Sequence, residues 1–273
     1  MGPTSWRVAS ASVMGSSHGK LGQPCQDAHH WVRLPGGWLL GAVADGAGSA
    51  KLGEVGADVA ARTAVDTLRQ EVDGVGLAPD GDKSHWRGLL TRALQAARDA
   101  VAAEAATRGE AVRELATTLL LVVATPERVA AAQVGDGAVV LGDNQGRIQG
   151  LTSPKVGEYI NETVFLVSPG ALAQAQTAVW EGEAAHLAAF SDGLQMLALK
   201  MPGGSPHGPF FEPLFRFVEQ AGDEAEASRK LGEFLQSPRL RDRTDDDLTL
   251  LLAARVDRLP GEPCSGAGPT DKS

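Results

Sequence analysis

The order in which apolar runs change their spacing constrains the fold of this chain more than any other feature. Short strand-like runs and turns occupy positions 6–44, and two segments with apolar residues three or four positions apart follow, at 57–72 and 90–101. Short runs return at Thr117, helical spacing comes back after Asp192, and one strand-like run closes the series. Strands, helices, strands, helices and a final strand in this order predict an α+β fold, with sheets packed together and helices outside.

Turn and cap residues define the individual elements. Pro35-Gly36-Gly37 predicts a hairpin turn, Ser84 is the expected N-cap of the second helix, and the Gly- and Ser-rich segment 15–22 predicts a loop. We expect strands at 6–13, 29–34, 38–44, 117–124, 128–134, 138–141, 147–151, 163–167, 184–190 and 248–256. We expect the later helices at 193–199, 210–220 and 223–236.

No repeat and no long polar linker divides the chain, so we expect a single domain over residues 1–258 and a flexible, Pro/Gly/Ser-rich tail at 259–273. The two cysteines, Cys25 and Cys264, provide neither a disulfide framework nor a thiolate zinc site, and we expect free thiols in a reducing cytoplasm. The sequence has no signal-peptide pattern and no run of roughly 18 apolar residues that could span a membrane. We therefore expect a soluble, cytoplasmic protein.

Net charge limits the classes of partner. The chain carries a formal charge of −9 and has no basic stripe, which argues against binding nucleic acid or an anionic membrane through bulk charge. It also argues against a metal-dependent nuclease. An anionic substrate would need help from bound cations.

Acidic residues stand where apolar runs meet loops. Asp45, Asp136 and Asp192 each end such a run and precede a glycine, and Asp246 stands just before the last run. Asp-Gly is a common turn pair, so each acid alone is explained by a turn. If the strands are neighbours, however, the four carboxylates gather at one sheet edge, where like charges raise one another's pKa unless cations neutralise them. Oxygen ligands of this kind suit Mg²⁺ or Mn²⁺.

A set of short blocks carries a family resemblance over residues 6–256. The blocks occur in this order: Gln26-Asp27-Ala28, Val43-Ala44-Asp45-Gly46-Ala47-Gly48-Ser49, Ala116-Thr117-Thr118, Val134-Gly135-Asp136, Phe190-Ser191-Asp192-Gly193-Leu194 and Asp246-Asp247-Leu248-Thr249. Together they resemble the metal-dependent (type 2C, PPM) serine/threonine protein phosphatases. Residues 157–165 and 208–215 resemble a bacterial branch of that family.

The resemblance implies two antiparallel β-sheets packed face to face with helix pairs outside, an α-β-β-α sandwich. It also implies two divalent cations, Mg²⁺ or Mn²⁺, which Asp45 would bridge. The Gly46 carbonyl would bind one ion, and Asp192 and Asp246 the other. Asp136, with Asp192, would hold a weaker third ion, and Asp27 would orient metal-bound waters. A water between the two ions would attack phosphorus in line, without a phosphoenzyme.

The sequence departs from the family pattern at three positions. Gly22 stands where many members have an arginine that grips the substrate phosphate, and His18, Lys20 or Arg33 are the candidates to replace it. Gln26 stands where the family has a glutamate. Ala47 stands where some members have a histidine that protonates the leaving group, a task left to His18 or to a metal-bound water.

Two functions of different classes therefore remain open. The favoured one is a cytoplasmic, monomeric protein phosphatase that acts on phosphoserine and phosphothreonine in a target of a serine/threonine kinase, a signalling role. The alternative is a pseudophosphatase on the same fold, a regulatory module that binds a phosphoprotein without turnover. Asp45, Asp192 and Asp246 favour activity, because a pure binding module has no need of all three.

Overall fold

Two β-sheets form the centre of the molecule in a computed structural model that describes residues 4–75, 81–154 and 163–257. One sheet has the order β1-β12-β9-β6-β7, the other β2-β3-β4-β5-β8, and each neighbouring pair is antiparallel. These strands are β1 (Ser5–Val13), β2 (Asp27–Leu34), β3 (Trp38–Asp45), β4 (Leu119–Ala124), β5 (Arg128–Val134), β6 (Ala138–Asp143), β7 (Ile148–Thr152), β8 (Gln176–Glu181), β9 (Ala184–Phe190) and β12 (Leu248–Val256). A further short pair is formed by β10 (Leu199–Lys200) and β11 (Ser205–Pro206).

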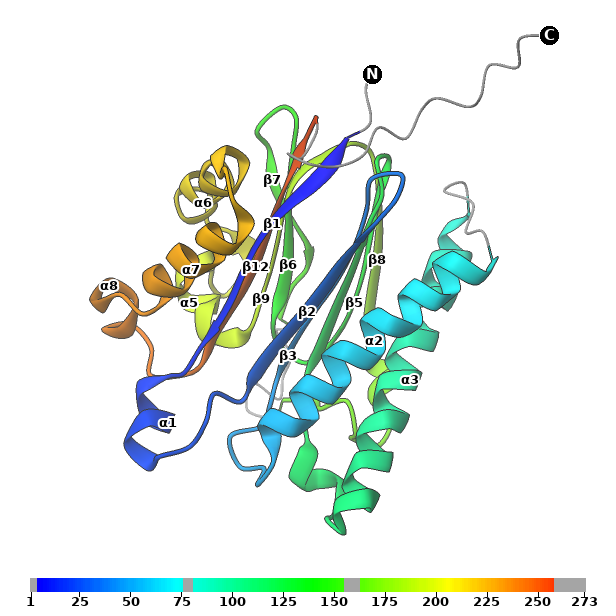
Figure 1. Cartoon of the computed structure of the whole chain (residues 1–273), viewed down its shortest axis with the longest axis vertical. Helices are drawn as coiled ribbons and strands as arrows, with labels where there is room; N and C mark the ends of the chain where they lie inside the picture. Colours follow the sequence, from blue (N-terminus) through cyan, green and yellow to red (C-terminus); the bar gives the residue numbers. More distant parts are fainter. Residues whose placement is uncertain (1–3, 76–80, 155–162, 258–273) are drawn as a thin grey trace, which may run out of the picture.

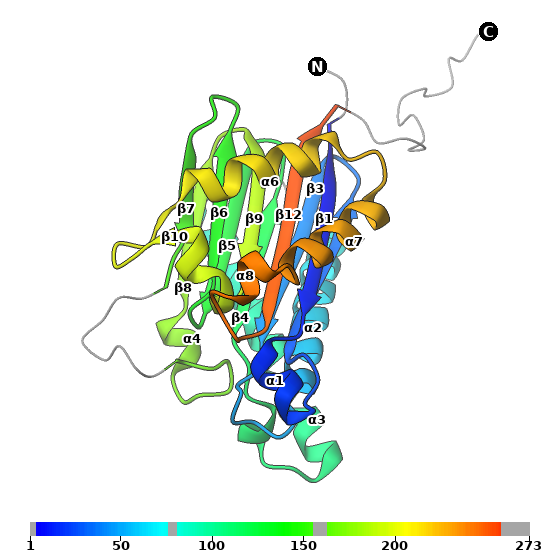
Figure 2. The same ribbon diagram turned by 90° about the vertical axis from the view of Figure 1, so that its left-hand side faces the viewer.

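Helices cover the outer face of each sheet. The long helices α2 (Gly53–Val75) and α3 (Lys83–Arg108) lie against the β2–β8 sheet, and α6 (Gly208–Gln220) and α7 (Glu224–Leu235) lie against the other (Figures 1 and 2). Shorter helices are α1 (Ser16–Leu21), α4 (Ala171–Gln174), α5 (Gln195–Ala198) and α8 (Pro238–Arg241), with the 3₁₀ turns η1 (Val112–Leu115) and η2 (Asp192–Leu194). The expected sandwich of two antiparallel sheets between helices is therefore confirmed.

Three apolar layers hold the sandwich together. The inner faces of the two sheets meet through side chains such as Trp6, Leu39 and Leu251, which are at most 1% exposed. A second layer packs α2 and α3 on their sheet and includes Trp86, and a third packs α6 and α7 on theirs and includes Phe211. Each sheet is thus buried on both faces, which explains why strands such as β4 read as continuous apolar runs. None of the helices in the described ranges is long and apolar enough to cross a membrane.

Several expected elements are wrong in detail. The segment 15–22 contains α1, which ends at Gly22 in a left-handed conformation with φ 67°. Asp82, not Ser84, caps α3, since its side chain accepts a hydrogen bond from His85 N at 2.8 Å. The stretch 193–199 forms only η2, α5 and the start of β10.

Residues 163–167 do not form the expected strand. Leu166 is fully buried and its backbone N donates to Thr117 O at 2.7 Å, so the apolar residues there fill the core from a loop. The strand β8 was not expected, because its edge position beside β5 is a tertiary feature. The expected tail at 259–273, Cys264 and most of the block 157–165 lie outside the described residues.

Candidate metal centre

The five acidic side chains that the sequence analysis singled out lie at one end of the sandwich. Asp45 ends β3, and Asp27 begins β2 directly opposite it in the antiparallel register. Asp192 follows β9, Asp246 precedes β12, and Asp136 lies between β5 and β6. Because β2 and β3 belong to one sheet and β9 and β12 to the other, the acids gather where both sheets end.

Mutual interactions of the carboxylates show that they share one site. Asp45 interacts with Asp27, Asp192 and Asp246, and Asp192 interacts in turn with Asp136 and Asp246. Asp27 also interacts with Asp192, across the two sheets. The structure therefore brings together all five carboxylates that the sequence analysis selected.

Burial and like charge make these carboxylates hard to ionise. Burial, the largest cause, raises the pKa of Asp27 to about 7 and that of Asp192 to about 6, with the charge of Asp136 adding to the latter. The pKa of Asp45 lies well above its ordinary value because of burial and the charges of Asp27 and Asp192. Burial also raises the pKa of Asp246. Nearby cations would favour the charged form of every one of these groups.

The donor atoms fit a hard divalent cation. Oδ1 of Asp27 and Oδ1 of Asp192 are buried and have no hydrogen-bond partner within the described ranges, although buried polar atoms are nearly always partnered. All the donors are oxygens, the ligands of Mg²⁺ and Mn²⁺. Within the described residues, however, no three His, Cys, Asp or Glu side chains are placed so that they could hold one metal ion.

Two threonines fix the strand end that carries Asp45. Thr118 Oγ1 accepts a hydrogen bond from Asp45 N at 3.0 Å, and Thr117 Oγ1 donates one to Asp45 O at 3.0 Å. Both threonines were expected in the strand at 117–124, but β4 begins only at Leu119. Gly46 follows Asp45 because the backbone of Gly53 passes so close that a Cβ at position 46 would lie 2.5 Å from its carbonyl carbon.

A chain of hydroxyl groups reaches Asp27 from the other sheet. Ser191 Oγ donates to Asp27 Oδ2 at 2.7 Å and accepts a hydrogen bond from Thr249 N at 3.0 Å. Thr249 Oγ1 donates to Ser12 Oγ at 2.6 Å, and Ser12 Oγ lies 2.8 Å from His29 Nδ1. These roles of Ser191, Thr249 and Ser12 were not predicted from the sequence. Ser191 and Thr249 lie within the family blocks, which was the one available signal.

Asp247 ties the segment around α1 to the same edge. Its carboxylate accepts hydrogen bonds from Gly15 N and Gln26 N, both at 2.6 Å, and Oδ2 lies 2.9 Å from His18 Nδ1. Asp247 is 2% exposed and His18 is 8% exposed. Asp247 thus holds structure around the site and places its charge near Asp27, and its neighbour Asp246 interacts with Asp45 and Asp192.

Comparison with known proteins agrees with this geometry. A family model described as Protein phosphatase 2C matches residues 14–236. The chain is also 38% identical to serine/threonine-protein phosphatase 3 of Escherichia coli over 255 residues, which is 91% of this chain and 98% of that protein. The chain belongs to the protein phosphatase 2C family. It is a phosphoprotein phosphatase, a serine/threonine phosphatase of that family with bacterial relatives.

Solved structures share the fold of this phosphatase at low sequence identity. The catalytic domain of the serine/threonine protein phosphatase PstP, in complex with two manganese ions, matches with a TM-score of 0.60 and 20% identity over 93% of this chain and 99% of that chain. The serine/threonine phosphatase Stp1 from Staphylococcus aureus matches with a TM-score of 0.59 and 17% identity over 90% of this chain and 94% of that chain.

The departures from the family pattern have structural explanations. Gly22 is the left-handed end of α1, a position that disfavours arginine. Arg33 is not available to bind phosphate, because it donates to Glu224 at 2.6 Å and to Trp6 O at 2.8 Å. Lys20 is exposed on the last turn of α1. His18 is the candidate nearest to the acids, since it interacts with Asp246 as well as Asp247.

Gln26, Ala47 and Cys25 complete the neighbourhood. Gln26 is 2% exposed, and its Oε1 has no hydrogen-bond partner within the described residues, so an uncharged oxygen remains where the family has a glutamate. Ala47 is buried against Ala50 and Ala116. Burial, together with the charges of Asp27 and Asp247, raises the pKa of the Cys25 thiol and keeps it protonated.

Proposed function

We propose that this phosphatase hydrolyses phosphoserine and phosphothreonine with two divalent cations, Mg²⁺ or Mn²⁺, held by Asp45, the Gly46 carbonyl, Asp192 and Asp246. Asp136 would contribute to a weaker third site. The observation that carries the proposal is the cluster of buried carboxylates with raised pKa and unpartnered oxygens at one sheet edge. Dependence on divalent cations agrees with membership of the family, and the number of ions is part of the proposal.

The cations, when bound, would lower the pKa of a water and neutralise charge on the phosphoryl oxygens. The residues of the chain hold the carboxylates of the centre in place. Thr117 and Thr118 hold the Asp45 backbone, and Ser191 donates to one oxygen of Asp27, while no donor from the described residues reaches the other, Oδ1. Asp27 can therefore accept a hydrogen bond from water in the centre.

His18 would act on the substrate side of the site. Its Nδ1 faces Asp247, and a Cβ at Gly48 would lie 3.9 Å from its Nε2, which directs the other ring nitrogen toward the loop after Asp45. From that position Nε2 could donate to a phosphate oxygen or to the leaving alkoxide, the two tasks that Gly22 and Ala47 cannot perform. Lys20, on the same helix, is the second candidate for phosphate binding.

The cellular setting is also a proposal. We place the enzyme in the cytoplasm as a monomer that reverses the action of a serine/threonine kinase. The family membership supports a phosphoprotein substrate. Among the described residues Cys25 has no disulfide partner, which agrees with a reducing compartment.

Hydrolysis of matched phosphopeptides tests the function. Chelator-treated protein should release phosphate from phosphoserine and phosphothreonine peptides only after Mn²⁺ or Mg²⁺ is added, and the phosphotyrosine peptide should be a poor substrate. Asp66→Asn, an exposed acid on α2, is the control for charge removal outside the centre. Full activity in metal-free protein would refute the mechanism. Tight phosphopeptide binding without turnover at any metal concentration would instead support the pseudophosphatase.

A further inference from the structure

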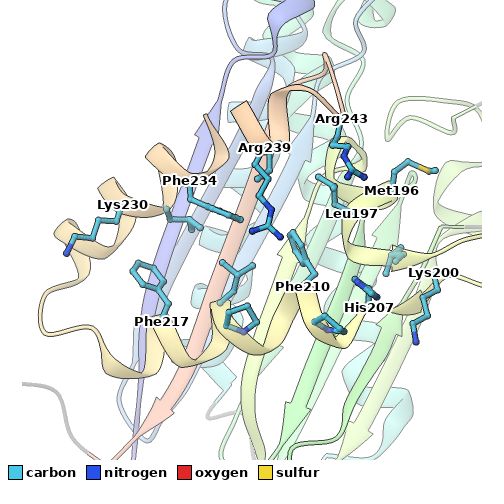
Figure 3. Close-up of a pocket in the computed structure, with 16 residues that line it drawn as sticks. Met196, Leu197, Lys200, His207, Phe210, Phe217, Lys230, Phe234, Arg239 and Arg243 are labelled. Atoms are coloured by element: carbon cyan, nitrogen blue, oxygen red, sulfur yellow. The ribbon is translucent and has the colours of Figure 1, made fainter. Parts of the chain in front are cut away.

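A groove opens on the outer surface formed by α5, α6, α7 and α8. Its volume is about 710 Å³. The side chains that line it come from all four helices and from β10 (Figure 3). It lies on the helical layer of the β1–β7 sheet, outside the carboxylate cluster described above.

The floor of the groove is apolar and incompletely covered. Leu214, Leu231 and Leu240 are buried beneath it, while Phe210, Phe217 and Phe234 are only half-buried. Met196 stands at the rim with 75% of its surface exposed. Aromatic and methionine side chains left partly exposed in a concave surface are typical of a site that binds an apolar partner.

The rim carries positive charge on a negatively charged protein. Lys200, Lys230, Arg239 and Arg243 all line the groove and are exposed, whereas the chain as a whole has a formal charge of −9. Lys230 has a salt bridge to Glu226 at 3.3 Å. Within the described residues, the other three cations have no ion-pair partner. The positive charge of this rim is therefore complementary to an acidic ligand, and it is opposite in sign to the net charge of the protein.

The cations are spread along the groove. Figure 3 shows Lys230 at one end, Lys200 at the other, and Arg239 reaching in between them. A single anionic headgroup, as in a fatty acid, would need them gathered at one point. A peptide with several acidic residues can meet them one by one while its apolar side chains enter the floor.

We propose that this groove binds an acidic segment of a partner protein that carries bulky apolar side chains. The groove adjoins the end of the sandwich where the carboxylates gather. α5 directly follows Asp192–Leu194, Gln195 Nε2 donates to Asp136 O at 2.7 Å, and Arg243 stands three residues before Asp246. A bound segment would thus lie beside the phosphatase centre, although its binding requires no catalysis.

Selection from a random peptide library tests the proposal on the whole protein. Twelve-residue peptides displayed on phage would be selected on wild type and counter-selected on the double variant Arg239→Glu/Arg243→Glu. The expected result is enrichment of sequences rich in Asp and Glu with two or three large apolar residues. Enrichment of basic sequences, or of none, would overturn the proposal.

Measured affinity then assigns the site. A selected peptide, labelled for fluorescence anisotropy, should lose about tenfold or more in affinity with Arg239→Glu/Arg243→Glu and with Met196→Glu. Arg87→Glu, a single charge reversal at an exposed position of α3 in the other helical layer, should leave the affinity unchanged. Melting temperatures close to wild type would show that the variants fold.

Two outcomes contradict the assignment directly. If the rim variants bind the peptide as well as wild type and Arg87→Glu, the peptide binds elsewhere. If sodium oleate raises the melting temperature of wild type but not of the rim variants, and no acidic peptide is selected, the occupant is a lipid. The proposed protein partner would then be wrong.

Discussion

Asp27 and Asp45 face each other across the β2–β3 pair, and a hydroxyl from the opposite sheet, Ser191, holds the first of them. The two carboxylates come from the ends of neighbouring strands, with Asp27 first in β2 and Asp45 last in β3. Ser191 Oγ, at the end of β9, donates to Asp27 Oδ2 at 2.7 Å. The centre therefore depends on how the two sheets sit against each other, and not on one strand end alone.

Replacing Asp45 should cost more activity than replacing Asp136. Asp45 lies among Asp27, Asp192 and Asp246, and as the proposed bridging ligand its loss would disturb both ions, whereas Asp136 would hold only a weaker third ion. We expect Asp45→Ala to lose about 10³-fold or more in kcat and Asp136→Ala clearly less, on the scale that loss of a preorganised charged group commonly causes. Phosphate release at saturating Mn²⁺ measures both. Comparable turnover in Asp45→Ala and wild type would contradict the ligand assignment.

Removing the hydroxyl of Ser191 should affect metal binding through Asp27. Its hydrogen bond lowers the pKa of Asp27, so Ser191→Ala raises that pKa further and removes a donor that orients the carboxylate. We expect about a 10–100-fold weaker apparent Mn²⁺ affinity or activity, with the pH profile shifted to higher pH. Metal titrations at several pH values measure the effect. Ser191→Thr, which keeps the hydroxyl, should restore the profile, and a loss equal to that of Ser191→Ala would indicate a purely structural role.

The phosphate contact should be traceable to His18 or Lys20. A charge-assisted contact is typically worth about 1.5–3 kcal/mol, and the arginine that would provide it in many relatives is replaced here by Gly22. We therefore expect a high KM for small phosphate esters. If His18 or Lys20 compensates, its replacement by Ala should raise KM about tenfold or more. His18 also contacts Asp247, so His18→Gln is measured beside it. If no replacement changes KM or kcat, the cations alone hold the phosphate.

Burial of His29 should make the fold less stable in mild acid. Burial, with the nearby charge of His30, lowers the pKa of His29 to about 4 from an ordinary value of 6.5. The fold favours the neutral form, so between pH 6.5 and pH 4 the unfolded chain binds a proton that the folded chain does not. The free energy of unfolding should therefore be unaffected by this group above pH 6.5 and should fall as the pH drops toward 4, by an amount on the order of 1–3 kcal/mol. Denaturant unfolding of wild type and His29→Gln between pH 7 and pH 4 tests this. As the pH falls from 7 to 4, wild type should lose stability relative to His29→Gln, and the control His85→Gln, at an exposed residue of α3, should keep the pH dependence of wild type.

The sequence alone determined the class of fold and the position of the acids along the chain. Runs such as 38–44 and 250–254 are apolar throughout because both faces of each sheet are covered, so they can be recognised locally. Asp45, Asp136 and Asp192 each follow an apolar run and precede a glycine, a pattern that can be seen in the sequence. The order of the short blocks along the chain carried the family resemblance. Each of these signals is contained in a stretch of only a few consecutive residues.

Tertiary structure decided the contacts between distant residues. Residues 163–167 have a strand-like composition, yet they fill the core from a loop, because composition does not distinguish a buried strand from a buried loop. Thr118 serves Asp45, and Ser191 serves Asp27, over separations of 73 and 164 residues. A hydroxyl that supports one of the clustered carboxylates differs from an ordinary one only in what the packed sheets place beside it. For the same reason the apolar groove with its positive rim, assembled from four helices and β10, became visible only once those elements were packed together.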